Sequence, residues 1–195
     1  MYKEIVGLSK PYLNQIYQNI MIHPDILFKA LGTWFLLCGF MDGIRTKAKR
    51  SKWLFIMWKV IVFFVFLGSM IMIIYVTLGN RYQVSDTKFK LELFWSYKEI
   101  IYNNNKFMLW QVAWNIIAFL PIGNALYYLV RPKKKLLKVV LICVAFSSCI
   151  ELIQLFGRFG LFEFDDIFDN TIGAFLGAVF AELLYKIMRL FFHKE

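Results

Sequence analysis

The sequence predicts an all-α fold, a polytopic membrane helix bundle of about five transmembrane helices preceded by an N-terminal amphipathic segment. Of the 195 residues, 59% are hydrophobic and the mean hydropathy is +0.56, so the chain has more apolar surface than a soluble globule of this size could bury. The 23 basic residues fall in short clusters between apolar runs. Such clusters orient helices in a membrane, so we expect no nucleic-acid partner.

The first 25 residues form the expected N-terminal segment. Its apolar side chains recur near helical spacing: Ile5, Leu8, Tyr12, Ile16 and Ile20. This pattern is typical of an amphipathic helix that lies in the membrane interface. No apolar core followed by a small-residue cleavage site precedes the first long apolar run, so we do not expect a cleaved signal peptide. The remainder, residues 26–195, is the expected transmembrane domain, and its motif-bearing part is 81–192.

The predicted spans are apolar runs long enough to cross a bilayer core, which takes roughly 20 helical residues. They cover residues 26–43, 53–79, 109–130, 136–156 and 171–191. The first run is the weakest, because Lys29 must extend toward the interface. In the third run Pro121 removes a backbone donor, which predicts a kink.

The loops set the predicted orientation through their basic residues. Lys and Arg crowd the short loops at 45–52 and 131–138. Because short cytoplasmic loops carry an excess of Lys and Arg, both loops are expected to be cytoplasmic. The prediction is therefore a multi-pass protein of the cell membrane with its N-terminus outside and its C-terminus cytoplasmic.

Polar side chains near the predicted outer ends of the spans are the candidate functional residues, because such groups are costly at membrane depth. In the fourth span Glu151, Gln154 and Arg158 follow spacings of three and four, which places them on one helix face. One interpretation is structural, in which Glu151 pairs with Arg158 through Gln154. The other is a functional site, since Glu151 lies at interior depth.

The start of the fifth span is acidic. Asp166 and Asn170 share a stripe with Gly173 and Gly177. Helix capping explains Asp169, but the adjacent acids Asp165 and Asp166 exceed what one cap needs. The two glycines predict close packing of this span against the fourth or the third.

The predicted topology also brings Asn115 of the third span and Arg81, which follows the second span, to this outer zone. Paired arginines can hold a phosphate or carboxylate, and neighbouring carboxylates can act as a general base or bind a divalent cation. Neither a cofactor nor a metal is specified. The candidate catalytic residues are Glu151, Asp165 and Asp166, and the candidate substrate-binding residues are Arg81, Asn115, Gln154, Arg158 and Asn170.

Four motifs in this region resemble the VanZ-like family of bacterial membrane proteins. They are NIIAFLPIG at 115–123, IELIQ at 150–154 followed by Arg158, FDDIFDNTIGAFLG at 164–177, and an LFWSY-like loop at 93–97. The resemblance implies a polytopic cell-envelope protein. The member that gives the family its name is associated with teicoplanin resistance, by a mechanism that does not rest on altering the D-Ala-D-Ala terminus.

The hypothesis from residues and resemblance together is a VanZ-like cell-envelope protein that contributes to glycopeptide (teicoplanin) resistance. It would act on or bind an anionic envelope lipid or lipid-linked glycan at the outer leaflet, so its expected partner is a membrane lipid or lipid-linked envelope precursor. A non-catalytic scaffold and a small-solute transporter are the alternatives. Whether the protein is an enzyme, and its oligomeric state, stay open at this point.

Overall fold

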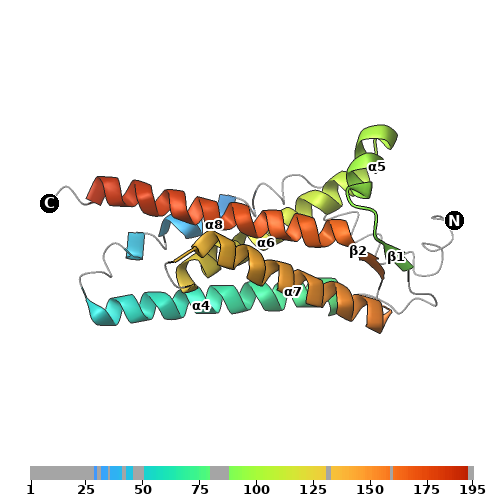
Figure 1. The fold of residues 1–195 in the computed structure, drawn as a ribbon. Coiled ribbons are helices and arrows are strands. Elements are labelled where there is room, and N and C mark those ends of the chain that lie inside the picture. Colours follow the sequence, from blue (N-terminus) through green and yellow to red (C-terminus); the bar gives the residue numbers. More distant parts are fainter. Residues whose placement is uncertain are drawn as a thin grey trace.

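The computed structural model describes residues 29, 32–34, 36–40, 43–45, 51–79, 88–130, 133–158 and 160–192. Its elements are α4 (Lys52–Ile74), the π-helical turn η1 (Tyr75–Gly79), β1 (Lys88–Lys90), α5 (Trp95–Asn103), α6 (Lys106–Leu129), α7 (Lys135–Gly157), β2 (Leu161–Glu163) and α8 (Phe164–Phe192). Figure 1 shows the long helices lying side by side, with α5, β1 and β2 gathered at one end of the bundle. Helical residues also precede α4 between 32 and 45.

Four helices among the described residues are long and apolar enough to cross a membrane: Lys52–Ile74, Lys106–Leu129, Lys135–Gly157 and Phe164–Met188. They correspond to the second through fifth predicted spans, and they make this a multi-pass membrane protein. The all-α prediction is confirmed, apart from two strands of three residues each. The predicted first span, 26–43, is described only in part, and the predicted amphipathic segment, 1–25, lies outside the described residues.

Helices α6 and α8 form the closest contact of the bundle because glycines line it. A Cβ added at Gly173 would lie 2.1 Å from the Ile116 carbonyl oxygen, and one at Gly177 would lie 2.1 Å from the Leu120 carbonyl oxygen. On the other side, a Cβ at Gly123 would lie 1.8 Å from a carbonyl oxygen of α8. The predicted close packing is thus confirmed, and the partner of the last span is the third predicted span.

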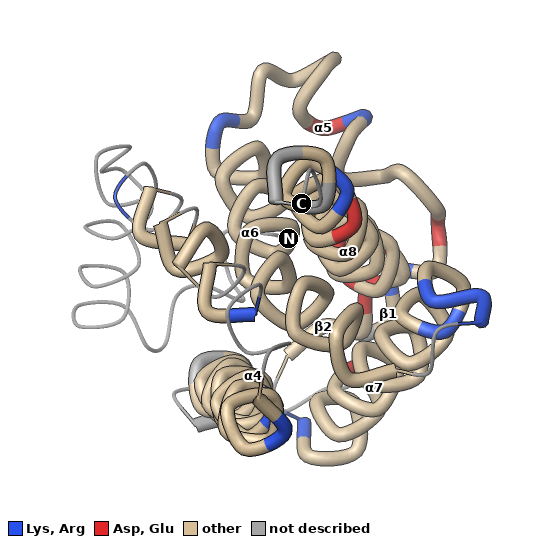
Figure 2. Tube along the Cα trace, turned by 90° about the vertical axis from the view of Figure 1, so that its left-hand side faces the viewer, with Lys and Arg blue, Asp and Glu red and all other residues tan. Residues whose placement is uncertain are grey.

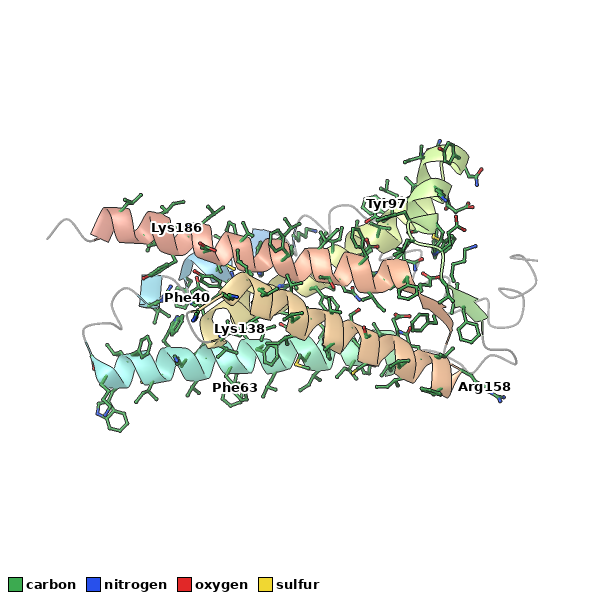
Figure 3. All side chains as sticks on the ribbon, in the orientation of Figure 1. Phe40, Phe63, Tyr97, Lys138, Arg158 and Lys186 are labelled. Atoms are coloured by element: carbon green, nitrogen blue, oxygen red, sulfur yellow. The ribbon has the colours of Figure 1, made fainter. Side chains whose placement is uncertain are left out.

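Helix α4 has an inner and an outer face. Trp58, Val62 and Ile73 are buried against the core, whereas large apolar side chains such as Phe63 and Phe64 are exposed. In Figure 3, Phe63 points away from the other helices. In a membrane protein an exposed apolar face of this kind contacts lipid rather than water.

The last helix begins earlier than the sequence predicted. α8 starts at Phe164 rather than at residue 171, with Asp165 and Asp166 in its first turn. Acidic side chains suit this position because they complement the positive end of the helix. The helix consequently includes the whole polar stretch that the sequence placed in a loop before it.

The segment before α6 contains structure that the sequence did not predict. β1 pairs in parallel with β2, with Lys88 opposite Leu161 and Lys90 opposite Glu163. The short helix α5 follows β1 and lies beside the start of α8 (Figure 1). This end of the bundle is therefore built from two distant parts of the chain, and it carries the candidate residues.

Candidate functional site

Asp165 anchors α5 to α8. One carboxylate oxygen accepts the Phe94 backbone N–H at 2.6 Å, and the other accepts the Ser96 backbone N–H at 2.9 Å together with the Ser96 hydroxyl. No side chain at the start of α5 caps that helix, so Asp165 takes the place of the missing cap. Only 1% of Asp165 is exposed, so its geometry indicates a positioning role, and its assignment as a catalytic residue stays a prediction.

Asp169 lies one turn further along α8 and contacts the same short helix. Its Oδ1 accepts a hydrogen bond from the Tyr97 hydroxyl, and its buried Oδ2 has no hydrogen-bond donor among the described residues. The predicted role of Asp169 as a cap of its own helix is wrong, because α8 starts at Phe164 and Asp169 lies beyond its first turn. Phe168 adds an edge-on ring contact to Phe94, at 5.0 Å between centroids.

Asp166 and Asn115 join α8 to α6. The Asn115 side-chain amide donates to Asp166 Oδ1 at 2.8 Å. Both side chains are partly exposed, in contrast to the buried Asp165 and Asp169 on the same helix. The structure thus brings together two residues that the sequence predicted to share a site.

Glu151 supports the strand before α8. Its carboxylate accepts the Glu163 backbone N–H at 3.1 Å, and the Gln111 amide donates to the Glu163 side chain at 3.3 Å. Glu151 is only 2% exposed, so the carboxylate lies inside the bundle, as its position in the sequence predicted. These contacts connect α7, β2 and α6.

Gln154 and Asn170 complete the buried part of the site. The Gln154 amide donates to the Thr77 carbonyl at 3.3 Å, within η1, while its Oε1 has no donor among the described residues. The Asn170 amide donates to the Ser147 hydroxyl at 2.8 Å. Because both amides bind groups on neighbouring helices, they fix the spacing of the helices at this end.

Of the two candidate arginines, Arg158 lies among the described residues, and it does not join this cluster. α7 ends at Gly157, and Arg158 has the left-handed conformation (φ 57°) that turns the chain away from the helix face. Arg158 is exposed and points away from the bundle in Figure 3. The predicted stacking of Arg158 on the face of Glu151 and Gln154 is therefore wrong. Arg81 lies outside the described residues.

Two residues that the sequence analysis did not assign, Ser96 and Tyr97, bind Asp165 and Asp169 directly. Both belong to the LFWSY-like loop, 93–97, and their partners belong to the motif at 164–177. The signal that could have found them was the occurrence of both motifs in one family pattern. Burial and the hydrogen bond to Asp169 raise the pKa of the Tyr97 hydroxyl, so it keeps its proton, and stays a donor, to a higher pH than an ordinary tyrosine.

The network as a whole is rich in carboxylates, which accept hydrogen bonds from hydroxyl groups, and in amides, which both donate to them and accept from them. The described residues contain no group of three or more His, Cys, Asp or Glu side chains arranged to hold a metal ion. The network consists of Asn115, Glu151, Gln154, Glu163, Asp165, Asp166, Asp169 and Asn170 with Ser96, Tyr97 and Gln111. We call this set the polar network below.

The fold and the polar network define a multi-pass helical membrane protein with a hydrogen-bonded acidic and amide cluster at one end of its bundle. The chain belongs to the VanZ/LLP1 family, whose model matches residues 55–188. This range runs from the first turn of α4 to the last turns of α8. Comparison with curated proteins gave no match, and comparison with solved structures gave none either.

Proposed function

We propose that this VanZ/LLP1 protein binds a lipid-linked envelope glycan at the end of the bundle that holds the polar network. The hydrogen-bonded pair of Asp166 and Asn115 is the main support. Both side chains are partly exposed, whereas Glu151, Asp165 and Asp169 are buried and hold the helices around them. The pair thus belongs, with Tyr97 and Gln111, to the partly exposed side of the network that a ligand can reach.

The chemistry of the pair suits a sugar. A carboxylate accepts hydrogen bonds from hydroxyl groups, and the side-chain amide of Asn115 can donate to one and accept from another. Arg81 and Arg158 stay the predicted binding residues for the anionic phosphate of a lipid carrier, with Arg158 reaching it from the exposed turn after α7 rather than from the polar network. Helix α8 offers such a ligand an apolar surface as well, since Phe164 and Phe168 are exposed.

Binding is favoured over catalysis because two of the three candidate catalytic carboxylates, Glu151 and Asp165, accept hydrogen bonds from backbone N–H groups in buried positions. A general base must reach the proton that it removes, and these two are enclosed by the protein. Asp166 is the carboxylate that could still act on a bound ligand. The proposal therefore includes an acid or base role for Asp166 alone.

The test measures binding of a lipid-linked glycan to the protein in nanodiscs. Asp166→Asn keeps the shape of the side chain but removes its charge. We expect about tenfold weaker binding, because the loss of one charge-assisted hydrogen bond changes the affinity by about this factor. Glu182→Gln, at the other end of α8, is the matched control and should bind like the wild type. Equal affinity of the wild type and Asp166→Asn would contradict the proposal.

The same variants test the contribution to teicoplanin resistance. Cells that express the wild type or Glu182→Gln are expected to tolerate more teicoplanin than cells that express Asp166→Asn at the same level. A pure scaffold predicts that every variant of normal stability gives full tolerance. A small-solute transporter predicts flux in proteoliposomes, which we do not expect.

The outer-leaflet position follows from the predicted orientation and needs its own test. In a cysteine-free background, Arg158→Cys and Asp166→Cys are labelled in whole cells with a membrane-impermeant thiol reagent. We expect labelling from outside, with Lys133→Cys in the basic loop labelled only after lysis. The opposite pattern would place the polar network on the cytoplasmic side and exclude an outer-leaflet ligand.

A further inference from the structure

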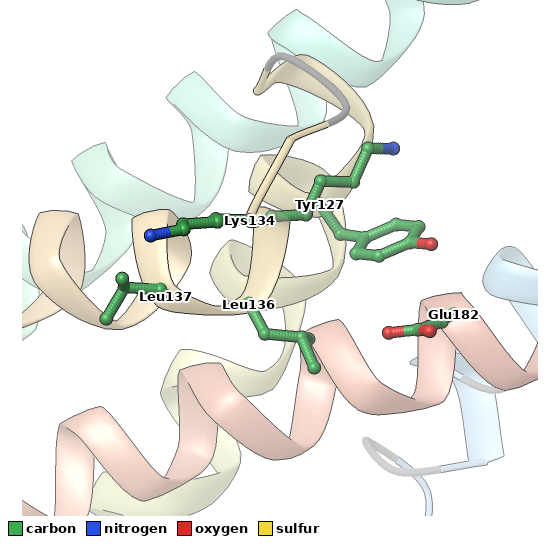
Figure 4. Close-up of a pocket in the computed structure, with 6 residues that line it drawn as sticks. Tyr127, Lys134, Leu136, Leu137 and Glu182 are labelled. Atoms are coloured by element: carbon green, nitrogen blue, oxygen red, sulfur yellow. The ribbon is translucent and has the colours of Figure 1, made fainter.

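Two adjoining pockets lie at the end of the bundle opposite the polar network. The larger, of about 380 Å³, is shown in Figure 4 and is lined by Tyr127, Lys134, Lys135, Leu136, Leu137 and Glu182. The smaller, of about 260 Å³, is lined by Arg45, Phe55, Trp58, Lys59, Tyr128, Leu129, Val130 and Lys135. Lys135 lines both pockets, so they adjoin at this side chain, and we call the two together the basic site.

The charge of the basic site is positive. Arg45, Lys59 and Lys135 line the smaller pocket, and its described lining contains no acidic residue. Glu182 is the acid in the described lining of the larger pocket, and it forms an ion pair with Lys186 at 2.8 Å. Cations converging from separate segments of the chain make a field that attracts an anion.

Aromatic rings hold these cations in place. The Arg45 guanidinium carbon lies 4.1 Å from the centroid of the Tyr185 ring, 4.9 Å from that of Tyr128 and 5.5 Å from that of Trp58. The Lys135 ammonium lies 4.1 Å from the centroid of the Tyr127 ring. Cation–π contacts at these distances fix the side chains, so a ligand meets cations that lose little freedom on binding.

The depth of the site points to a membrane lipid. It lies where α4 and α7 begin and α6 ends, which is the interfacial level of the spans. Figure 2, which views this end of the bundle, shows basic segments at the near ends of α4 and α7. Trp53, at the same end of α4, is 76% exposed, as expected for a side chain in the interfacial aromatic belt. Lipid phosphates lie at this level.

We propose that the basic site binds the phosphate of an anionic membrane lipid. Lys59 and Lys135 contact the phosphate, Arg45 adds a third cation, and the acyl chains lie along the exposed apolar face of α4 next to Phe55. Basic pockets between transmembrane helices recognise anionic headgroups by this combination of charge and depth. The proposal concerns the opposite end of the bundle from the glycan site and does not depend on it.

The experiment measures lipid binding to the detergent-solubilised full chain by native mass spectrometry. The lipids are phosphatidylglycerol and phosphatidylcholine, and the variant is Lys59→Gln with Lys135→Gln. We expect phosphatidylglycerol to bind the wild type preferentially, and the double variant to bind it roughly tenfold to thirtyfold more weakly, since each lysine near an anionic headgroup contributes about fivefold. The matched control, Lys106→Gln with Lys133→Gln, changes exposed lysines that line neither pocket and should bind like the wild type.

A second measurement locates the lipid and detects misfolding. Lysine acylation followed by peptide mass spectrometry should show that phosphatidylglycerol protects Lys59 and Lys135 but not Lys133 or Lys186. Equal protection by inorganic phosphate would show a site for a free anion and overturn the lipid assignment. Equal weakening in the control variant, or equal binding of both lipids, would overturn the basic site itself.

Discussion

The two ends of the bundle differ in the sign of their charged side chains and in the groups that these side chains contact. At the polar network the carboxylates of Glu151 and Asp165 are at most 2% exposed and accept backbone N–H groups. At the basic site the cations of Arg45 and Lys135 lie over aromatic rings and line open pockets. One end is thus held by hydrogen bonds inside the protein, and the other presents its charges to whatever reaches the pockets.

The difference follows from the geometry of the groups. A carboxylate buried in the bundle needs donors for its oxygens, and backbone N–H groups at the ends of helices and strands supply them. An ammonium or guanidinium can instead lie against an aromatic face and still contact further groups. The acidic end is therefore expected to be structurally rigid, and the basic end is expected to exchange ligands.

The largest effect is expected from disrupting the close packing of α6 against α8, which supports both ends of the bundle. Gly123→Leu would force a side chain into α8, where even a Cβ would lie 1.8 Å from a carbonyl oxygen. Overpacking costs about 3 kcal/mol or more, so we expect little folded protein by size-exclusion chromatography. Gly68→Leu on α4, where a Cβ meets nothing within 4 Å, is the control. Normal folding of Gly123→Leu would contradict the packing described.

A smaller effect, confined to one end, is expected from Asp165→Ala. The variant leaves the N–H groups of Phe94 and Ser96 without their acceptor, which costs about 2 kcal/mol. Hydrogen exchange should accelerate at α5 and stay unchanged near the basic site. Glu92→Gln, which alters an exposed ion pair with Lys98, should leave the exchange of α5 unaffected. Uniform acceleration along the chain would mean that the two ends are not independent.

The corresponding change at the basic site is Arg45→Lys. It keeps the charge but loses the planar group that lies over Tyr185, Tyr128 and Trp58, and we expect a cost of about 1 kcal/mol. Thermal unfolding measures the loss, and Lys133→Arg, at an exposed position, is the control. An unchanged melting temperature would show that the rings do not hold the guanidinium.

The smallest effect concerns pH. Burial and the hydrogen bond to Asp169 raise the pKa of Tyr97, so the contribution of the neutral phenol is complete below the ordinary tyrosine value of about 10. It is lost as the pH rises through the raised pKa of the folded state. Above pH 10, the melting temperature of Tyr97→Phe should therefore fall less steeply with rising pH than that of the wild type. The difference in slope should correspond to the titration of about one tyrosine.

The long apolar helices could be predicted because their length alone identifies them. The predicted span 136–156 differs from α7 by one residue at each end, Lys135 and Gly157. α8 was placed too late because its first turns are acidic, and apolar content does not reveal a helix whose acids bind other segments. α5 and the paired strands were missed because they are short and depend on contacts far along the chain.

The polar network could be predicted in part. Asn115 and Asp166 meet as the sequence indicated, since helical spacing and topology bring them to the same end. Tyr97 could not be assigned from periodicity, because its partner is 72 residues away. Arg158 does not share the helix face of Glu151 and Gln154 as predicted, because helical spacing was extended past Gly157, where α7 ends. Its substrate-binding role stays a prediction.

The cap of α5 also sets an order of assembly. Asp165 follows the Phe94 amide that it binds by 71 residues, and it lies in the last helix of the bundle. During synthesis from the N-terminus, α5 emerges from the ribosome without a cap and obtains one only when α8 has been inserted. The polar network is therefore completed only once α8 has been inserted, so a chain truncated before α8 would lack this site.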